Sequence, residues 1–386
     1  MTKSRILATV AAVGLTMGAT LGLASPALAA ATVSPTVIET GFYASSSAYN
    51  PTATTVAVAN YGSSYYVKDS SVDFIDVATN TVINVTDDAI TDATALVWAP
   101  DGSKVYVLNY SGGITVIDAA THAVVDTLVS GSAPSNSGLA ITPDGSYLLT
   151  GDYSSGAGAV VDISANTYES LLLLTDESVF NIFVSPDGTK AYFMTYYGAV
   201  DVIDLTDPLY AIVGTLQFDN MGYGGLSSCM SFDGNTLFMA DYNDGSPATI
   251  ARLDLASGTS TSTTAMISES IDCTMTPDGK NVLFGSYGKE DISTVYEFDA
   301  TTLAAVTSYD IQPEDASDVL ASSPLKCDVY VSNFYETTNI LNFDCSLPDT
   351  GASQALVITL ASVGGGLLVL GIVAVILVRR RNAKTD

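Results

Sequence analysis

The chain has 386 residues, with 13 Lys and Arg against 41 Asp and Glu, which gives a formal net charge of −28. Nucleic acids and anionic membrane surfaces bind through clustered basic side chains, so this balance excludes both as expected partners. With a single histidine, His122, the chain is not expected to hold nickel, copper or zinc.

Residues 1–29 are predicted to form a secretory signal peptide with a helical apolar core. Lys3 and Arg5 precede an apolar stretch from Ile6 to Leu23, and the segment ends at the A-x-A cleavage site Ala27-Leu28-Ala29. We therefore expect export, with the mature chain beginning directly after this segment.

Residues 30–346 carry a repeat with a period of 43 to 49 residues, in which an aromatic residue follows a turn position by ten residues. The turn positions are Pro51, Pro100, Pro143, Pro186, Phe232, Pro277 and Pro324. The aromatic residues are Tyr61, Tyr110, Tyr153, Tyr196, Tyr242, Tyr287 and Phe334. A fixed period of this length indicates one supersecondary unit stacked on itself.

Each copy reads as four short strands. In the second copy, Ala95–Trp98 leads into the turn Pro100-Asp101-Gly102, and three further apolar runs follow, at 105–108, 114–117 and 124–128. The runs are rich in β-branched and aromatic residues and are bounded by turn formers, which is typical of strands. An aspartate also recurs after the third run of every copy: Asp76, Asp118, Asp162, Asp204, Asp254, Asp299 and Asp344.

Seven copies of four strands predict an all-β fold, a seven-bladed β-propeller of four-stranded antiparallel blades. Tyr106-Val107-Leu108-Asn109 and Tyr330-Val331-Ser332-Asn333 resemble the YVTN-type propeller repeat, over roughly residues 36–346. The last copy has no fourth run. We expect the strand-like segment Thr36–Glu39 to complete the last blade, which would close the ring and remove an open sheet edge.

The C-terminal region begins with Leu347-Pro348-Asp349-Thr350-Gly351. Ala355–Val378 follows without a charge, which predicts a transmembrane helix, and Arg379–Arg381 would hold the tail in the cytoplasm. This arrangement resembles the cell-wall sorting signal of Gram-positive bacteria. The resemblance implies that a sortase cleaves after Thr350, joins it to peptidoglycan and removes residues 352–386, so that membrane contact is transient. The alternative is an ordinary single-pass membrane protein.

The finished domain, residues 30–350, would carry 40 acidic and 7 basic side chains and thus a net charge of −33. The strand order places the Pro-Asp-Gly turns on one rim of the propeller, which we call the turn rim. The recurrent aromatic residues lie on the opposite rim, the aromatic rim. The chain leaves the last blade on the turn rim, so the aromatic rim should face away from the anchor and carry binding loops.

The candidate binding face consists of these aromatic residues and two irregular loops, which contain Tyr223 and Tyr242-Asn243-Asp244. Aromatic side chains beside polar residues suit a glycan or a peptide segment of a protein ligand. Alternatively, the aromatic residues pack between blades and the polar residues before them cap strand ends. The preceding polar residues are Asn60, Asn109, Asp152, Thr195, Asp241, Ser286 and Asn333.

No resident cofactor is expected, although acidic loops could bind calcium. Asp241, Asn243 and Asp244 form one group of oxygen ligands, and a second is Asp87, Asp88 and Asp92. Neither matches the full calcium-loop pattern, which requires a distal glutamate at fixed spacing.

Four cysteines in an exported domain predict two disulfides. Cys327 and Cys345 flank antiparallel neighbouring strands, and Cys229 and Cys273 lie in innermost strands of adjacent blades. Free buried thiols are the alternative for each pair.

These features predict a non-catalytic binding module displayed near the cell wall. The alternative is a secreted, wall-attached hydrolase or lactonase-like enzyme that uses carboxylates on the propeller face. A Ser-His-Asp triad would have to use His122, which has no obvious nucleophile beside it.

Overall fold

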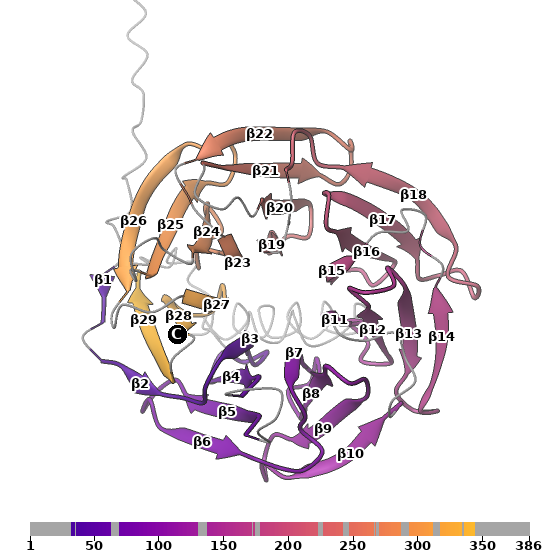
Figure 1. Ribbon diagram of the computed structural model, residues 1–386, viewed down its shortest axis with the longest axis vertical. Helices are drawn as coiled ribbons and strands as arrows, with labels where there is room; N and C mark the ends of the chain where they lie inside the picture. The colour runs from indigo at the N-terminus through magenta and orange to yellow at the C-terminus, as the bar shows by residue number, and fades with distance from the viewer. Residues whose placement is uncertain are drawn as a thin grey trace, which may run out of the picture.

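The computed structural model describes residues 32–343 except for 35, 63–68, 130–136, 172, 174–177, 223–226, 242–246, 266, 268–269, 287–292, 312–316 and 334–335. Within these residues the regular secondary structure consists of 29 β-strands, which form seven antiparallel sheets around a central axis (Figure 1). The prediction of an all-β, seven-bladed propeller is therefore confirmed. The described part of the chain has no helix that could cross a membrane. The predicted signal helix, sorting motif and C-terminal helix lie outside it.

Six blades have four strands each, and the first strand in sequence lies nearest the axis (Figure 1). In chain order, these blades are β3 (Ala44–Tyr49), β4 (Thr55–Asn60), β5 (Ser71–Asp76), β6 (Val82–Val85); β7 (Ala93–Trp98), β8 (Lys104–Asn109), β9 (Ile114–Asp118), β10 (Val124–Leu128); β11 (Ser137–Ile141), β12 (Tyr147–Gly151), β13 (Gly158–Asp162), β14 (Thr167–Leu171); β15 (Val179–Val184), β16 (Lys190–Thr195), β17 (Ala199–Asp204), β18 (Ile212–Gln217); β19 (Ser227–Met230), β20 (Thr236–Ala240), β21 (Ala248–Asp254), β22 (Ser260–Ala265); and β23 (Ser270–Met275), β24 (Asn281–Ser286), β25 (Ser293–Asp299), β26 (Ala305–Ile311).

The seventh blade joins the two ends of the described chain. Its inner strands are β27 (Ser317–Ala321), β28 (Asp328–Asn333) and β29 (Thr337–Asn342). Two short N-terminal strands, β1 (Thr32–Val33) and β2 (Ile38–Glu39), both pair with β29 on its outer edge. The predicted closure by the N-terminal segment is thus confirmed. The outer position is filled by two strands rather than one, however, and it begins at Thr32 instead of Thr36.

The core consists of seven apolar clusters, each lying between two adjacent blades. The cluster between the first two blades, for example, joins Phe74 and Val72 to Leu96 and Trp98. Each blade is therefore buried on both faces. This arrangement explains why the strand runs are apolar throughout instead of alternating between apolar and polar residues.

The turn rim is built from tight contacts between successive turns. Gly102 has a φ of +73°, which favours glycine, and the carboxylate of Asp101 accepts the N–H of Ser103 at 2.9 Å. A methyl group on Gly145 would lie 3.3 Å from Cδ of Pro100 in the preceding blade. The repeated Pro and Gly positions thus pack against each other around the ring.

The recurrent aspartates close the turns between third and fourth strands. Oδ1 of Asp118 accepts the N–H and the hydroxyl of Thr121, each at 2.8 Å, and these bonds hold the pKa of Asp118 below its ordinary value. Asp76 makes the same contacts with Thr79. These side chains have a structural role, and Asp344 lies outside the described residues.

Candidate functional site

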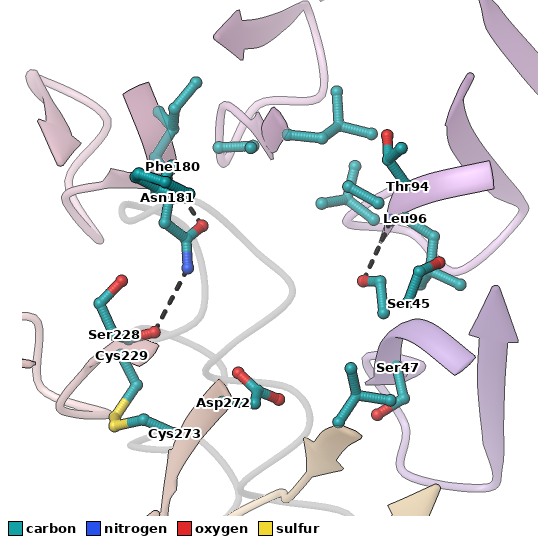
Figure 2. A pocket seen from close by; sticks show the side chains of 18 of the residues that line it. Ser45, Ser47, Thr94, Leu96, Phe180, Asn181, Ser228, Cys229, Asp272 and Cys273 are labelled. Atoms are coloured by element: carbon teal, nitrogen blue, oxygen red, sulfur yellow. Dashed lines mark hydrogen bonds between the residues drawn. A yellow bond between two sulfur atoms is a disulfide. The ribbon is translucent and has the colours of Figure 1, made fainter. Parts of the chain in front are cut away.

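The innermost strands of all seven blades surround a central pocket of about 660 Å³. Figure 2 shows side chains from different blades facing one another across it. Among its described lining residues, Asp272 is the only charged one; the others are small, apolar or uncharged polar residues. A volume of this size is typical of small-molecule sites.

One repeat position on the pocket wall connects neighbouring blades. It lies five residues before each turn position and is occupied by Ser46, Ala95, Gly138, Asn181, Ser227, Asp272 and Val319, all of which except Ser227 line the pocket. Oγ of Ser46 accepts the N–H of Leu96 at 3.2 Å, and Oδ2 of Asp272 accepts the N–H of Leu320 at 2.7 Å. Leu96 and Leu320 occupy the same position in their blades, so serine and aspartate here perform the same structural task.

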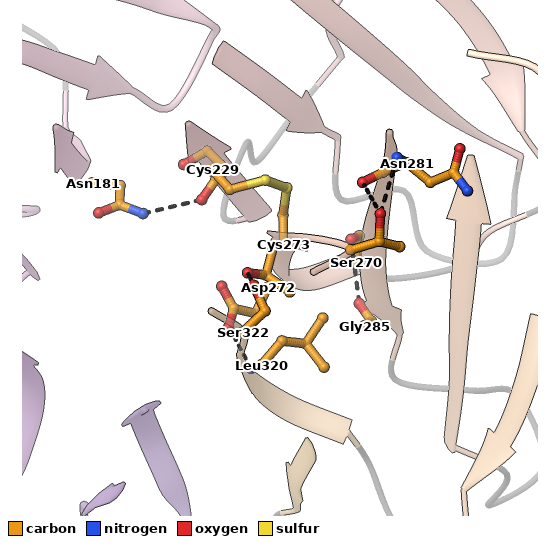
Figure 3. The surroundings of a disulfide bond; sticks show 12 residues. Asn181, Cys229, Ser270, Asp272, Cys273, Asn281, Gly285, Leu320 and Ser322 are labelled. Atoms are coloured by element: carbon orange, nitrogen blue, oxygen red, sulfur yellow. Dashed lines mark hydrogen bonds between the residues drawn. A yellow bond between two sulfur atoms is a disulfide. The ribbon is translucent and has the colours of Figure 1, made fainter. Parts of the chain in front are cut away.

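Asp272 is held firmly at the pocket wall (Figure 3). Its carboxylate accepts the N–H of Leu320 in the next blade. The following residue, Cys273, forms a disulfide with Cys229 in the preceding blade, and the two Cα atoms are 5.3 Å apart. Burial raises the pKa of Asp272 to about 7, and hydrogen bonds from the backbone N–H groups of Leu320 and Cys273 only partly oppose that effect.

Four of the predicted rim aromatics are described, and they occur in two rows that join neighbouring blades. In the first row, the ring centroid of Tyr61 lies 5.5 Å from that of Tyr43 and 6.3 Å from that of Tyr110. Tyr43 precedes β3 and lines the pocket, so this row runs from the rim to the pocket mouth.

The second row centres on Phe180, which also lines the pocket. Its ring centroid lies 5.0 Å from that of Tyr153 in the preceding blade and 5.2 Å from that of Tyr196 in its own blade. Tyr197 continues the row, 5.1 Å from Tyr196. Tyr110, Tyr153 and Tyr197 are exposed by 45%, 47% and 48%, so both rows combine packing between blades with a face open to solvent.

The remaining predicted face residues lie outside the described residues. These are Tyr223, Tyr242, Asn243, Asp244, Tyr287 and Phe334, together with Leu347, Pro348, Asp349, Thr350 and Gly351 of the sorting motif.

The polar residues that precede the aromatic positions are engaged in hydrogen bonds. The buried Asn60 donates to Asp73 at 2.8 Å, and Oδ1 of Asn109 accepts the N–H of Thr91 at 3.0 Å. These contacts fix the strand ends and the loops beside them, which fits the structural interpretation of these polar residues.

The described acidic loop residues do not assemble a metal site. Both carboxylate oxygens of the buried Asp241 accept backbone N–H groups, from Thr249 at 2.6 Å and from Gly222 at 3.1 Å. Among the residues that the structure describes, no three acidic, histidine or cysteine side chains lie close enough together to hold a metal ion, and this includes Asp87, Asp88 and Asp92.

The predicted disulfide between Cys229 and Cys273 is confirmed (Figure 3). The predicted partner of Cys327, Cys345, lies outside the described residues. The carbonyl of Cys327 accepts the N–H of Phe343 at 2.8 Å, so the two strands that flank this pair are adjacent as expected.

Sequence reasoning missed the pocket residues Tyr43, Phe180 and Asp272. For Asp272 a signal existed, because alignment of the seven copies shows a carboxylate where the other blades carry neutral residues. Tyr43 lies next to a β-bulge at the start of β3, and Phe180 lies within a β-bulge at the start of β15. No short sequence motif marks such a bulge.

Neither a protein-family model nor a curated protein matches the chain. Among solved structures, hydrazine synthase of Kuenenia stuttgartiensis is similar, with a TM-score of 0.56 and 24% sequence identity. The match covers 72% of this chain and 84% of that chain. At this level of identity the similarity supports the propeller fold alone.

Proposed function

We propose that this protein is exported, is joined to the cell wall through Thr350 and acts as a non-catalytic binding module whose aromatic rim faces outward. The main support is the position of the chain exit. β29 ends at Asn342, opposite Asp328 at the start of β28, whereas the aromatic position follows the other end of β28. The described chain thus ends on the turn rim, and in the sequence the sorting motif begins five residues after Asn342.

The exposed aromatic rows support a binding role for the outward rim. Tyr110 and Tyr153 present nearly half of their surface to solvent, and their rows of rings lead to the pocket-lining residues Tyr43 and Phe180. Aromatic rings that are held by packing on one face and are exposed to solvent on the other can contact sugars and peptide segments favourably. The ligand class is therefore a glycan or a protein surface.

The anchor is tested by cell fractionation. Thr350→Ala should release the protein from the wall fraction into the membrane and the medium, because the sortase joins the protein through this residue. Thr359→Ala, which leaves the pentapeptide intact, is the matched control. Wall attachment that is unchanged in Thr350→Ala would refute the proposed anchoring.

The binding role is tested with the secreted chain of residues 30–350, which retains every residue that the structure describes. This chain is screened against wall glycans, matrix proteins, and chromogenic esters and glycosides. Tyr110→Ala and Tyr153→Ala should weaken saturable binding, whereas Leu209→Ala, which removes an 85% exposed side chain on the turn rim, should not. Turnover that a single carboxylate substitution abolishes would instead support a wall-attached hydrolase or lactonase-like enzyme.

A further inference from the structure

The carboxylate of Asp272 is not needed to hold the blades together. Ser46 performs the same contact to the next blade with a neutral hydroxyl, and the second and seventh blades have Ala95 and Val319 at this position. An aspartate here adds a carboxyl group whose ionised form places a charge on the pocket wall. Placing a charge in a partly buried site is costly unless a partner of opposite charge compensates it.

No such partner is present among the described residues. None of the described lysine or arginine side chains lines the pocket, and the two groups that donate to Asp272, the N–H groups of Leu320 and Cys273, are neutral. The only ion pair in the described part of the chain joins Lys280 to Asp278, beside the turn rim. Within the described residues, therefore, nothing supplies a countercharge for the ionised carboxylate of Asp272.

We propose that the central pocket binds a primary ammonium group, with Asp272 as its counter-ion. This inference rests on the proposed function, because it names the chemistry of a ligand for the same outward face. Phe180 lies one repeat position nearer the aromatic rim than Asp272, and Tyr43 lines the same mouth. A cation entering from that rim passes aromatic rings, which attract cations through their faces.

The pocket suits an ammonium group better than a metal ion. Calcium requires six to eight oxygen ligands, whereas an ammonium group has three protons to donate. Asp272 supplies the one carboxylate among the described lining residues, too few oxygen ligands for calcium but sufficient as a counter-ion for an ammonium group. The negative net charge of the chain also favours the approach of cations.

The ammonium group could be carried by a lysine side chain of a peptide or by a free alkylamine, and the probes distinguish these sources. They are N-acetyl-lysine N-methylamide, n-butylamine, and N-acetyl-norleucine N-methylamide, which has the lysine skeleton without the charge. Binding to residues 30–350 is measured by calorimetry and by ligand-observed NMR. We expect at least one of the amines to bind at a single site, and the norleucine probe to bind roughly tenfold or more weakly.

The variants isolate the charge. Asp272→Asn, and Asp272→Ser, which copies Ser46, should each weaken amine binding roughly tenfold or more. Asp126→Asn removes one charge from the exposed strand β10 and should leave the affinity unchanged. Thermal unfolding establishes that each variant is folded; if one of the two pocket variants does not fold, the other decides.

Three results would overturn the inference: no amine binding by the folded wild-type protein, equal affinity for the lysine and norleucine probes, or unchanged amine affinity in the folded pocket variants. Failure of the proposed function is distinguishable from these results. In that case Tyr110→Ala and Tyr153→Ala would leave glycan and protein binding unaffected, or no such binding would be found.

Discussion

The disulfide between Cys229 and Cys273 gives a quantitative test of how the ring is stabilised. The bond joins the innermost strands of two adjacent blades and closes a segment with a sequence separation of 44 residues. In the chain-entropy model, a loop of this length contributes about 4 kcal/mol to the free energy of unfolding. For a propeller of roughly 300 residues, this corresponds to a Tm about 6 °C higher.

The perturbation is the double substitution Cys229→Ala and Cys273→Ala, measured by urea unfolding with the fluorescence of Trp98 as the probe. The variant should lose about 4 kcal/mol without a reductant. Adding a reductant should destabilise the wild-type protein by at least this amount, because it also breaks any second disulfide. Cys327→Ala leaves the bond between Cys229 and Cys273 intact and measures separately what the predicted second disulfide, with Cys345, contributes.

Mass spectrometry of the wild-type protein must first establish that the bond is formed. If it is formed and the double variant unfolds within about 1 kcal/mol of the wild-type protein, the reasoning from loop closure is wrong. Stability would then come from the apolar layers between the blades alone. A further loss on reduction of the double variant would instead indicate a second disulfide.

Three further predictions follow from individual contacts. In urea unfolding, Ile38→Ala should destabilise the protein by about 2–5 kcal/mol, because Ile38 is 4% exposed and packs in the closing blade. Its neighbour Val37 is 43% exposed, so Val37→Ala should cost less than about 1 kcal/mol. Trp98→Phe should lose about 1–3 kcal/mol in thermal unfolding, because the indole N–H donates to the carbonyl of Ala48 in the preceding blade at 3.0 Å. The folded protein retains a proton on Asp272 up to about pH 7, whereas the unfolded chain releases it near pH 4, so the stability that this group contributes at low pH is lost as the pH rises. The free energy of unfolding of Asp272→Asn should therefore rise by about 2–4 kcal/mol relative to that of the wild-type protein between pH 4 and pH 7. A difference that does not change with pH would contradict the reasoning.

Blade number and strand order were predictable from the sequence because local turn chemistry repeats in every copy. Gly102 adopts a positive φ, which favours glycine, and Asp118 accepts a backbone hydrogen bond in the turn that follows its strand. These signals act within a few residues, so they survive without knowledge of the tertiary structure. The bond between Cys229 and Cys273 was predictable for a related reason, since both residues belong to innermost strands of adjacent blades.

The pocket was not predictable in the same way. Its wall depends on β-bulges that shift the innermost strands by one residue, as between Val179 and Asn181, and short sequence patterns do not specify a bulge. β1 was missed because Thr32–Val33 has too few residues to show a strand pattern. Its position is set instead by pairing with Asn342, more than 300 residues away.

The pairing of Thr32 with Asn342 also determines the order in which the molecule can assemble. β1 has no partner until β29 is available, so under the proposed export the final step of folding would follow the translocation of β29. Contacts between residues so distant in sequence form slowly. During this interval both edges of the unfinished ring are open to pairing with other chains, which makes it the stage most exposed to aggregation.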